Sequence, residues 1–136
     1  MWTRIFAGSG PPLRNELAGA TVMVIESDFY QASEIGKAMQ EAGATVLGPH
    51  GTALAALQRI AFQSPSCAIV DVNLGDGVLF GVADALRDKG VPLLFVTNAS
   101  PDSIPVSLAD VPVLRKPASK HQIVEAAVRL IGAHPR

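Results

Sequence analysis

The sequence predicts an α/β fold in which a five-stranded, doubly wound parallel sheet is covered by helices on both faces. Short apolar runs typical of buried strands occupy 21–26, 44–48, 67–71, 92–97 and 112–115. The segments between them carry apolar residues at helical spacing. Strands that alternate with helices pair in parallel, because each crossover needs about the length of a helix. A polar or charged residue closes or follows four of the runs, at the edge where such sheets form their sites.

Residues 1–19 precede the alternation and differ from it. They contain a Gly-Ser-Gly-Pro-Pro stretch and show no hydrophobic periodicity, which predicts a flexible N-terminal extension. Trp2, Ile5 and Phe6 leave a second interpretation open, in which the extension is a hydrophobic arm that docks on a partner or on this domain. We therefore place the folded domain at residues 20–133.

Apolar stripes define the helices. After the first strand, Ala32, Ile35, Met39 and Ala42 fall on one helical face, and a glycine follows where that helix should end. Similar patterns recur along the chain and predict helices at 29–42, 52–63, 78–89 and 119–132.

The connection between the fourth and fifth strands breaks this regularity. It contains Pro101 and Pro105, and neither proline fits the middle of a helix at low cost. We expect only a short fourth helix here, which starts near Pro105 and ends by Asp110.

Composition narrows the function. The chain has 136 residues, enough for one domain with a real core, and its formal net charge of -1 gives no basic field for nucleic acid or an anionic membrane. No apolar run approaches the roughly 20 residues that cross a bilayer, and residues 1–19 hold no apolar stretch typical of a signal peptide. The single cysteine, Cys67, has no partner for an intrachain disulfide, so we expect a reduced, cytoplasmic setting.

Four polar side chains stand at the ends of predicted strands. Glu26 and Asp71 follow two apolar runs, Thr97 closes a third and Lys116 follows a fourth. Because a buried acid is costly without a partner, their joint occurrence favours one converging site over four unrelated surface residues. Carboxylates, a hydroxyl and an ammonium together suit a cation and a phosphoryl group.

These residues resemble the receiver domain of two-component response regulators, a flavodoxin-like family, over about residues 20–133. The resemblance implies the strand order 2-1-3-4-5. It implies that Asp71 is the phosphoacceptor, that Thr97 hydrogen bonds the phosphoryl group and that Lys116 precedes a cis proline. Glu26 matches the first residue of the family's acidic pair, and Asn73 matches the position whose backbone carbonyl binds the metal.

The implied function is phosphorelay signalling. Asp71 would accept a phosphoryl group from a histidine kinase or phosphotransfer protein, with Mg²⁺ held by Glu26, Asp71 and the Asn73 carbonyl. Such a protein catalyses at most its own phosphorylation and dephosphorylation. The sequence ends soon after the last predicted helix, so we expect a stand-alone receiver that contacts an unknown downstream protein, either as a monomer or as a homodimer, and no nucleic acid or membrane.

Two positions depart from the family pattern. Ser27 stands where the second acid is usual, which predicts a weakened magnesium site. Asp28 comes next, and we favour a role as helix N-cap over metal ligation. Val113 occupies the place of an aromatic residue that rotates on phosphorylation in many receivers, so we expect altered switching through the fourth and fifth strands.

Three other functions compete with this one. A phosphatase of the haloacid dehalogenase class would need a second aspartate at position 73, where this chain has Asn73. A nucleotide- or flavin-binding module would need a phosphate cradle after the first strand, where Glu26 and Asp28 would repel phosphate. A pseudo-receiver, which binds partners without accepting phosphate, is the main alternative because of Ser27.

Overall fold

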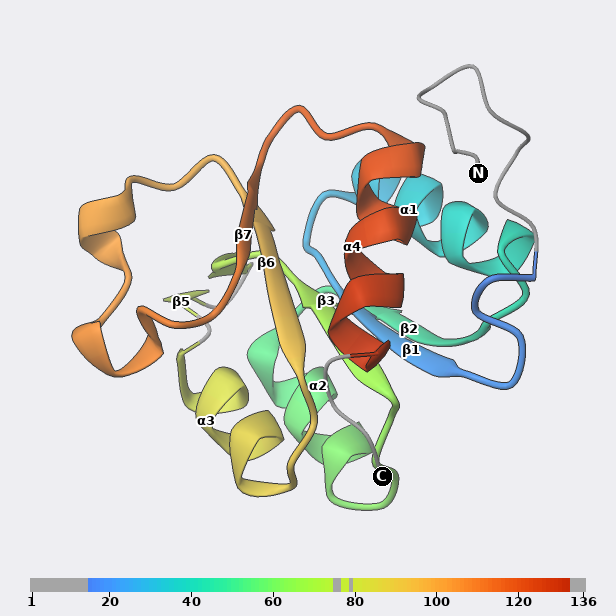
Figure 1. Ribbon diagram of the computed structural model, residues 1–136. Helices are drawn as coiled ribbons and strands as arrows, with labels where there is room; N and C mark the ends of the chain where they lie inside the picture. The colour runs from blue at the N-terminus through green and yellow to red at the C-terminus, as the bar shows by residue number, and fades with distance from the viewer. Residues whose placement is uncertain (1–14, 75–76, 79, 133–136) are drawn as a thin grey trace.

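The computed structural model describes residues 15–74, 77–78 and 80–132 and has one central parallel sheet (Figure 1). Its strands are β1 (Thr21–Ile25), β2 (Thr45–His50), β3 (Cys67–Val70), β6 (Leu93–Thr97) and β7 (Val113–Arg115). Their order across the sheet is β2-β1-β3-β6-β7, and every neighbouring pair is parallel. Counted along the chain, this is the order 2-1-3-4-5, so the predicted fold class is confirmed.

Helices cover both faces of the sheet, as predicted. Figure 1 shows α1 and α4 on one side and α2 and α3 on the other. The helices start and end within three residues of their predicted bounds: α1 (Phe29–Glu41), α2 (Ala53–Ile60), α3 (Phe80–Asp88) and α4 (Lys120–Gly132).

The core consists of two layers separated by the sheet. Side chains alternate along a strand, so neighbouring residues of β1 enter opposite layers. Met23 packs in the layer closed by α2 and α3, and Val24 packs in the layer closed by α1 and α4. Every residue of β3 and β6 is buried, which makes these central strands the rigid base of their carboxyl ends. Among the described residues, Phe95 is the largest fully buried side chain, and aliphatic residues fill most of the remaining core.

Two 3₁₀ helices replace an α-helix between β6 and β7. They are η1 (Pro101–Ser103) and η2 (Val106–Leu108), and each begins at or just after one of the two prolines. The short fourth helix expected near Pro105 is therefore a single 3₁₀ turn. Leu108 is buried and anchors this turn to the layer of α2 and α3.

Near the N-terminus, the packed part of the chain begins before the predicted boundary at residue 20. Leu17 is 2% exposed, packs in the layer of α1 and α4, and donates its N–H to the Ala42 carbonyl. Residues 1–14 and 133–136 lie outside the described residues, so the flexible extension and the C-terminal boundary stay predictions. Within the described residues, no helix is long and apolar enough to cross a membrane.

A small hairpin follows β3 and was not predicted. It pairs β4 (Asn73–Leu74) with β5 (Gly77–Val78) in antiparallel register. The hairpin fixes the backbone of Asn73 beside the end of β3, where Asp71 lies.

Candidate functional site

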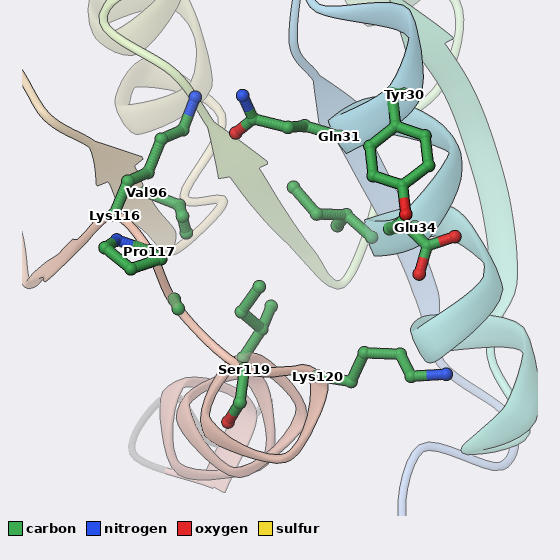
Figure 2. A pocket seen from close by; sticks show the side chains of 11 residues that line it. Tyr30, Gln31, Glu34, Val96, Lys116, Pro117, Ser119 and Lys120 are labelled. Atoms are coloured by element: carbon green, nitrogen blue, oxygen red, sulfur yellow. The ribbon is translucent and has the colours of Figure 1, made fainter.

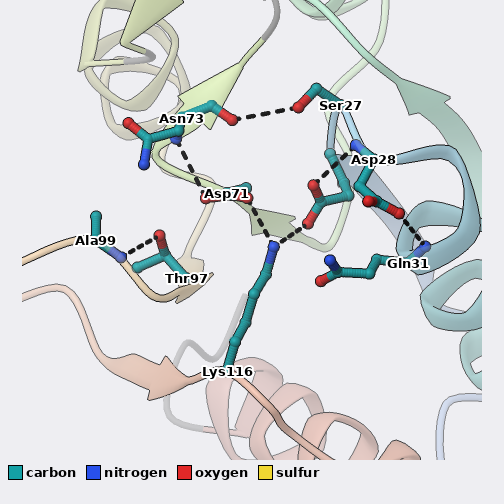
Figure 3. Close-up of polar contacts among 9 residues, drawn as sticks. Ser27, Asp28, Gln31, Asp71, Asn73, Thr97, Ala99 and Lys116 are labelled. Carbon is teal, nitrogen blue, oxygen red and sulfur yellow. Dashed lines mark hydrogen bonds and ion pairs between the residues drawn. The ribbon is translucent and has the colours of Figure 1, made fainter.

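The carboxyl ends of four strands bring the predicted residues together in one cluster (Figure 3). Glu26 follows β1, Asp71 follows β3, Thr97 ends β6 and Lys116 follows β7. Because these strands are parallel and adjacent in the sheet, their ends lie at the same edge. Glu26, Asp71 and Thr97 are the buried polar or charged residues of the described chain, at 3%, 7% and 0% exposure.

Lys116 joins the two acids. Its Nζ lies 2.8 Å from Glu26 Oε1 and 2.8 Å from Asp71 Oδ2. The lysine side chain is 12% exposed, so all three charges are largely removed from water. Desolvated charges of this kind are stable only when they are paired and hydrogen bonded, and here one ammonium serves two carboxylates.

A backbone N–H group donates a hydrogen bond to the second carboxylate oxygen of each acid. The Asp28 N–H donates to Glu26 Oε2 at 3.0 Å, and the Asn73 N–H donates to Asp71 Oδ1 at 3.2 Å. Both donors lie two residues after the acid, so the turn that ends each strand also orients its carboxylate. The Thr97 hydroxyl also lies beside Asp71 and helps to lower its pKa.

The two acids respond to this environment in opposite directions. Burial raises the pKa of Asp71, but hydrogen bonds from Lys116, the Asn73 N–H and Thr97 outweigh it and hold that pKa below its usual range. Burial also raises the pKa of Glu26, and there the hydrogen bonds from Lys116 and Asp28 do not offset it. Asp71 is therefore the carboxylate that stays ionised most readily, as a nucleophile must.

Thr97 is fixed by the backbone on both sides. Its hydroxyl oxygen accepts from the Ala99 N–H at 3.1 Å, and its carbonyl accepts from the Lys116 N–H at 3.1 Å. With the oxygen engaged by Ala99, the hydroxyl proton is the part left to donate to Asp71. The structure thus holds Thr97 as a donor beside the candidate nucleophile.

Ser27 and Asp28 take different roles. Asp28 caps α1, since its Oδ1 accepts from the Gln31 N–H at 2.9 Å, and the predicted N-cap is confirmed. The Ser27 hydroxyl instead points across the site and donates to the Asn73 carbonyl at 3.4 Å. That carbonyl is the predicted metal ligand, so the Ser27 hydroxyl donates a hydrogen bond to the oxygen that a metal ion would bind.

The donor set suits magnesium in type but carries little charge. Two carboxylates, a backbone carbonyl and a hydroxyl are the hard oxygen ligands that Mg²⁺ prefers. Glu26, Asp71 and the Asn73 carbonyl would hold the ion, but Lys116 already pairs with both carboxylates. Within the described residues, no group of three or more His, Cys, Asp or Glu side chains is placed to bind a metal.

A pocket adjoins the cluster on the side of Lys116. It has a volume of about 350 Å³ and lies between α1 and the connection from β7 to α4. Figure 2 shows Gln31 and Lys116 on opposite walls of this pocket. Tyr30, near the start of α1, lines this pocket and is 72% exposed.

Two contacts at this edge were not predicted from the sequence. One is the hydrogen bond from Ser27 to the Asn73 carbonyl, and the other is the reach of Arg115 to the loop after Thr97. Both join a side chain to a backbone carbonyl, and residue types alone carry no signal for such a contact.

Comparison with solved structures shows that this is the fold of a receiver domain. SdrG from Sphingomonas melonis matches at 29% identity with a TM-score of 0.70, over 84% of this chain and 98% of that chain. A response regulator receiver protein from Sinorhizobium medicae matches at 16% identity with a TM-score of 0.73, over 85% and 97% of the two chains.

A third similar structure was described with a metal. It is the receiver domain of a sensor histidine kinase from Pseudomonas aeruginosa with a magnesium ion coordinated in the active site cleft, at 18% identity and a TM-score of 0.73, covering 85% of this chain and 99% of that chain. No protein-family model matches this chain, and no curated protein matches its sequence.

Proposed function

We propose that this protein is a receiver that accepts a phosphoryl group on Asp71 from a histidine kinase or phosphotransfer protein. The observation that carries the proposal is the pairing of Lys116 with an Asp71 carboxylate whose pKa is lowered and which is 7% exposed at the edge of the sheet. An ion pair with a purely structural role has no need of contact with solvent. The Asp71 carboxylate instead stays ionised and retains a small exposed fraction at the edge of the sheet.

The proposed transfer needs few groups. An Asp71 oxygen attacks the phosphorus of a phosphohistidine, a new O–P bond forms, the P–N bond breaks and the imidazole leaves with the electron pair of that bond. Lys116 stabilises the negative charge of the phosphoryl group, and the Thr97 hydroxyl donates a hydrogen bond to a phosphoryl oxygen. Mg²⁺, when bound to Glu26, Asp71 and the Asn73 carbonyl, supplies charge that offsets the repulsion between nucleophile and phosphate.

Ser27 makes the metal site weaker than one with a second acid. It contributes no negative charge, and its hydroxyl donates to the Asn73 carbonyl that the ion would need. The proposal therefore includes weak magnesium affinity and slow phosphoryl transfer. It also includes cytoplasmic action on a downstream protein, with no catalysis beyond the chain's own phosphorylation and dephosphorylation.

A small phosphodonor tests this function directly. Wild-type protein incubated with acetyl phosphate and MgCl₂ should gain the mass of one phosphoryl group, and Asp71→Asn, which keeps the shape but loses the nucleophile, should not. Ser27→Asp should label faster, because it restores a charged ligand. Labelling of Asp71→Asn at the wild-type level would move the phosphoryl group elsewhere and refute the assignment.

One observation favours a second function, that of a pseudo-receiver. Lys116 and the backbone amides satisfy both acids, and Ser27 satisfies the Asn73 carbonyl, so the cluster is complete without any ligand. If wild type and Ser27→Asp both stay unlabelled with acetyl phosphate, the pseudo-receiver replaces the proposed function.

A further inference from the structure

Arg115, the last residue of β7, holds the loop that follows Thr97. Its guanidinium donates to the Ala99 carbonyl and, at 3.4 Å, to the Asn98 carbonyl. Arg115 is paired with Thr97 in the register of β6 and β7. The side chain thus leaves the edge strand opposite Thr97 and reaches forward to the next two residues of the neighbouring chain segment.

The same loop fixes the hydroxyl of Thr97. Ala99 uses its N–H for Thr97 Oγ1 at 3.1 Å and its carbonyl for Arg115. Moving Ala99 therefore moves the group that holds the threonine oxygen. A continuous chain of hydrogen bonds leads from Arg115 through Ala99 to Thr97. The Thr97 hydroxyl in turn lies beside Asp71, at the end of the neighbouring strand.

We infer that Arg115 is a positioning residue, which holds Ala99 so that the Thr97 hydroxyl stays directed at Asp71. This inference rests on the proposed function for its effect on phosphoryl transfer, although its structural part does not. Asn98 and Ala99 precede η1, and Ser100 caps that turn with its own side chain. No regular helix therefore orders residues 98–100, and the guanidinium supplies the fixation.

Arginine suits this role better than lysine. Its planar group presents several N–H donors in a fixed fork, so it can engage both carbonyls at once, whereas an ammonium is a single mobile point charge. Charged donors also make stronger hydrogen bonds than neutral ones. Arg115→Lys should consequently restore only part of the positioning.

The test compares Arg115→Met with Arg87→Met. Arg87 also ties down the segment between β6 and β7, through Asp110 at 2.8 Å, but does so after η2 and far along the chain from Thr97. Each variant removes an exposed guanidinium that holds the segment between β6 and β7, so Arg87→Met controls for general loosening of that segment. Each protein is measured by NMR without phosphodonor, for Ala99 amide exchange and for the Thr97 χ1 rotamer from three-bond couplings, and then by labelling with acetyl phosphate and MgCl₂.

We expect Ala99 amide exchange to rise about tenfold in Arg115→Met, because opening the loop no longer breaks charged hydrogen bonds. Thr97 should change from one rotamer to an average of several, and labelling should slow by about threefold or more. Arg115→Lys should fall between, and Arg87→Met should match wild type in all three measurements.

Two results would overturn the inference. One is a Thr97 rotamer that stays fixed in Arg115→Met, which would show that the threonine needs no help from the loop. The other is averaging of that rotamer with unchanged labelling. If wild type takes no phosphate at all, the proposed function fails, and the Thr97 couplings still decide whether Arg115 positions the hydroxyl.

Discussion

Replacing Lys116 by methionine tests the electrostatic core of the site. Within the described residues, Lys116 is the cation paired with both Glu26 and Asp71, and the two carboxylates are 2% and 8% exposed in their side chains. Methionine keeps the unbranched shape of lysine and removes the charge. The variant therefore leaves two buried acids without their counter-ion and changes little else.

The expected loss of stability follows from burial. Breaking a buried ion pair by removing one partner costs about 3–5 kcal/mol, because the remaining charge is left uncompensated. Two contacts of 2.8 Å are lost at once, so we expect a loss of about 4 kcal/mol near pH 7.5. With a urea dependence of about 2 kcal/mol per molar, the unfolding midpoint should fall by about 2 M.

The assay is urea unfolding in EDTA at about pH 7.5 and about pH 5, followed by circular dichroism. The loss should shrink at the lower pH, because carboxyls without a cation are desolvated, have raised pKa values and take up protons. Lys120→Met is the matched control. Lys120 lies 3.7 Å from Glu41 with both side chains more than half exposed, so its removal should cost less than about 1 kcal/mol.

A second variant guards against complete unfolding of Lys116→Met. Adding Glu26→Gln removes one of the two uncompensated charges, so the double variant should regain part of the lost stability at about pH 7.5. If Lys116→Met loses no more stability than Lys120→Met, or loses the same amount at both pH values, the acids do not depend on the lysine.

Three further predictions concern the neighbours of Lys116. The pKa of Glu26 is raised in the folded state, so its contribution to stability is full below about pH 4.5 and is lost as the pH rises through the folded-state pKa. Glutamine does not titrate. The stability of Glu26→Gln, measured by urea unfolding, should therefore rise relative to that of wild type as the pH increases from about 4.5. A constant or falling difference would contradict this. Ser27→Asp should bind Mg²⁺ at least about tenfold more tightly than wild type in calorimetry. Two opposite unit charges 4 Å apart attract by about 4 kcal/mol at an effective dielectric constant of 20, and a third of that energy is enough for a tenfold change in affinity. Ser27→Ala is the control, and equal affinity of Ser27→Asp and wild type would count against a metal site here. Asp28→Ala should lower the free energy of unfolding, measured in urea, by about 1 kcal/mol, because the side chain that caps the Gln31 N–H is removed. The backbone N–H of residue 28 can still donate to Glu26. An unchanged free energy of unfolding would show that the cap is dispensable.

The sequence was sufficient for the fold and for the meeting of the main site residues. The strand order and the four strand-end residues are coupled, because parallel neighbouring strands must end at one edge. Glu26 and Asp71 come after β1 and β3, which are adjacent, so their proximity needed only the topology. The two prolines likewise predicted where regular helix would fail before β7.

Other features depended on backbone geometry that residue types do not encode. The hairpin of β4 and β5 has two residues in each strand, too few for an alternation to show. The contact between Ser27 and the Asn73 carbonyl needs both turns in their final positions. The sequence alone indicates only that Arg115 ends a strand, and its hydrogen bond to the Ala99 carbonyl becomes evident once the position of that loop is known.

The number of charged residues at this edge could be counted from the sequence, but the way in which Lys116 pairs with the two acids could not. Glu26, Asp71 and Lys116 sum to a net charge of one negative unit, and that sum does not say which acid the lysine serves. The structure has it serve both at 2.8 Å, while Thr97 adds its hydroxyl to Asp71 alone. The pKa of Asp71 is lowered, whereas the pKa of Glu26 is raised because burial outweighs its hydrogen bonds from Lys116 and Asp28. Ser27 is exposed at this edge and adds no charge, so Lys116 faces two carboxylates rather than three. An acid in its place would add a third negative charge beside the pair, and that charge is the one a bound cation would offset.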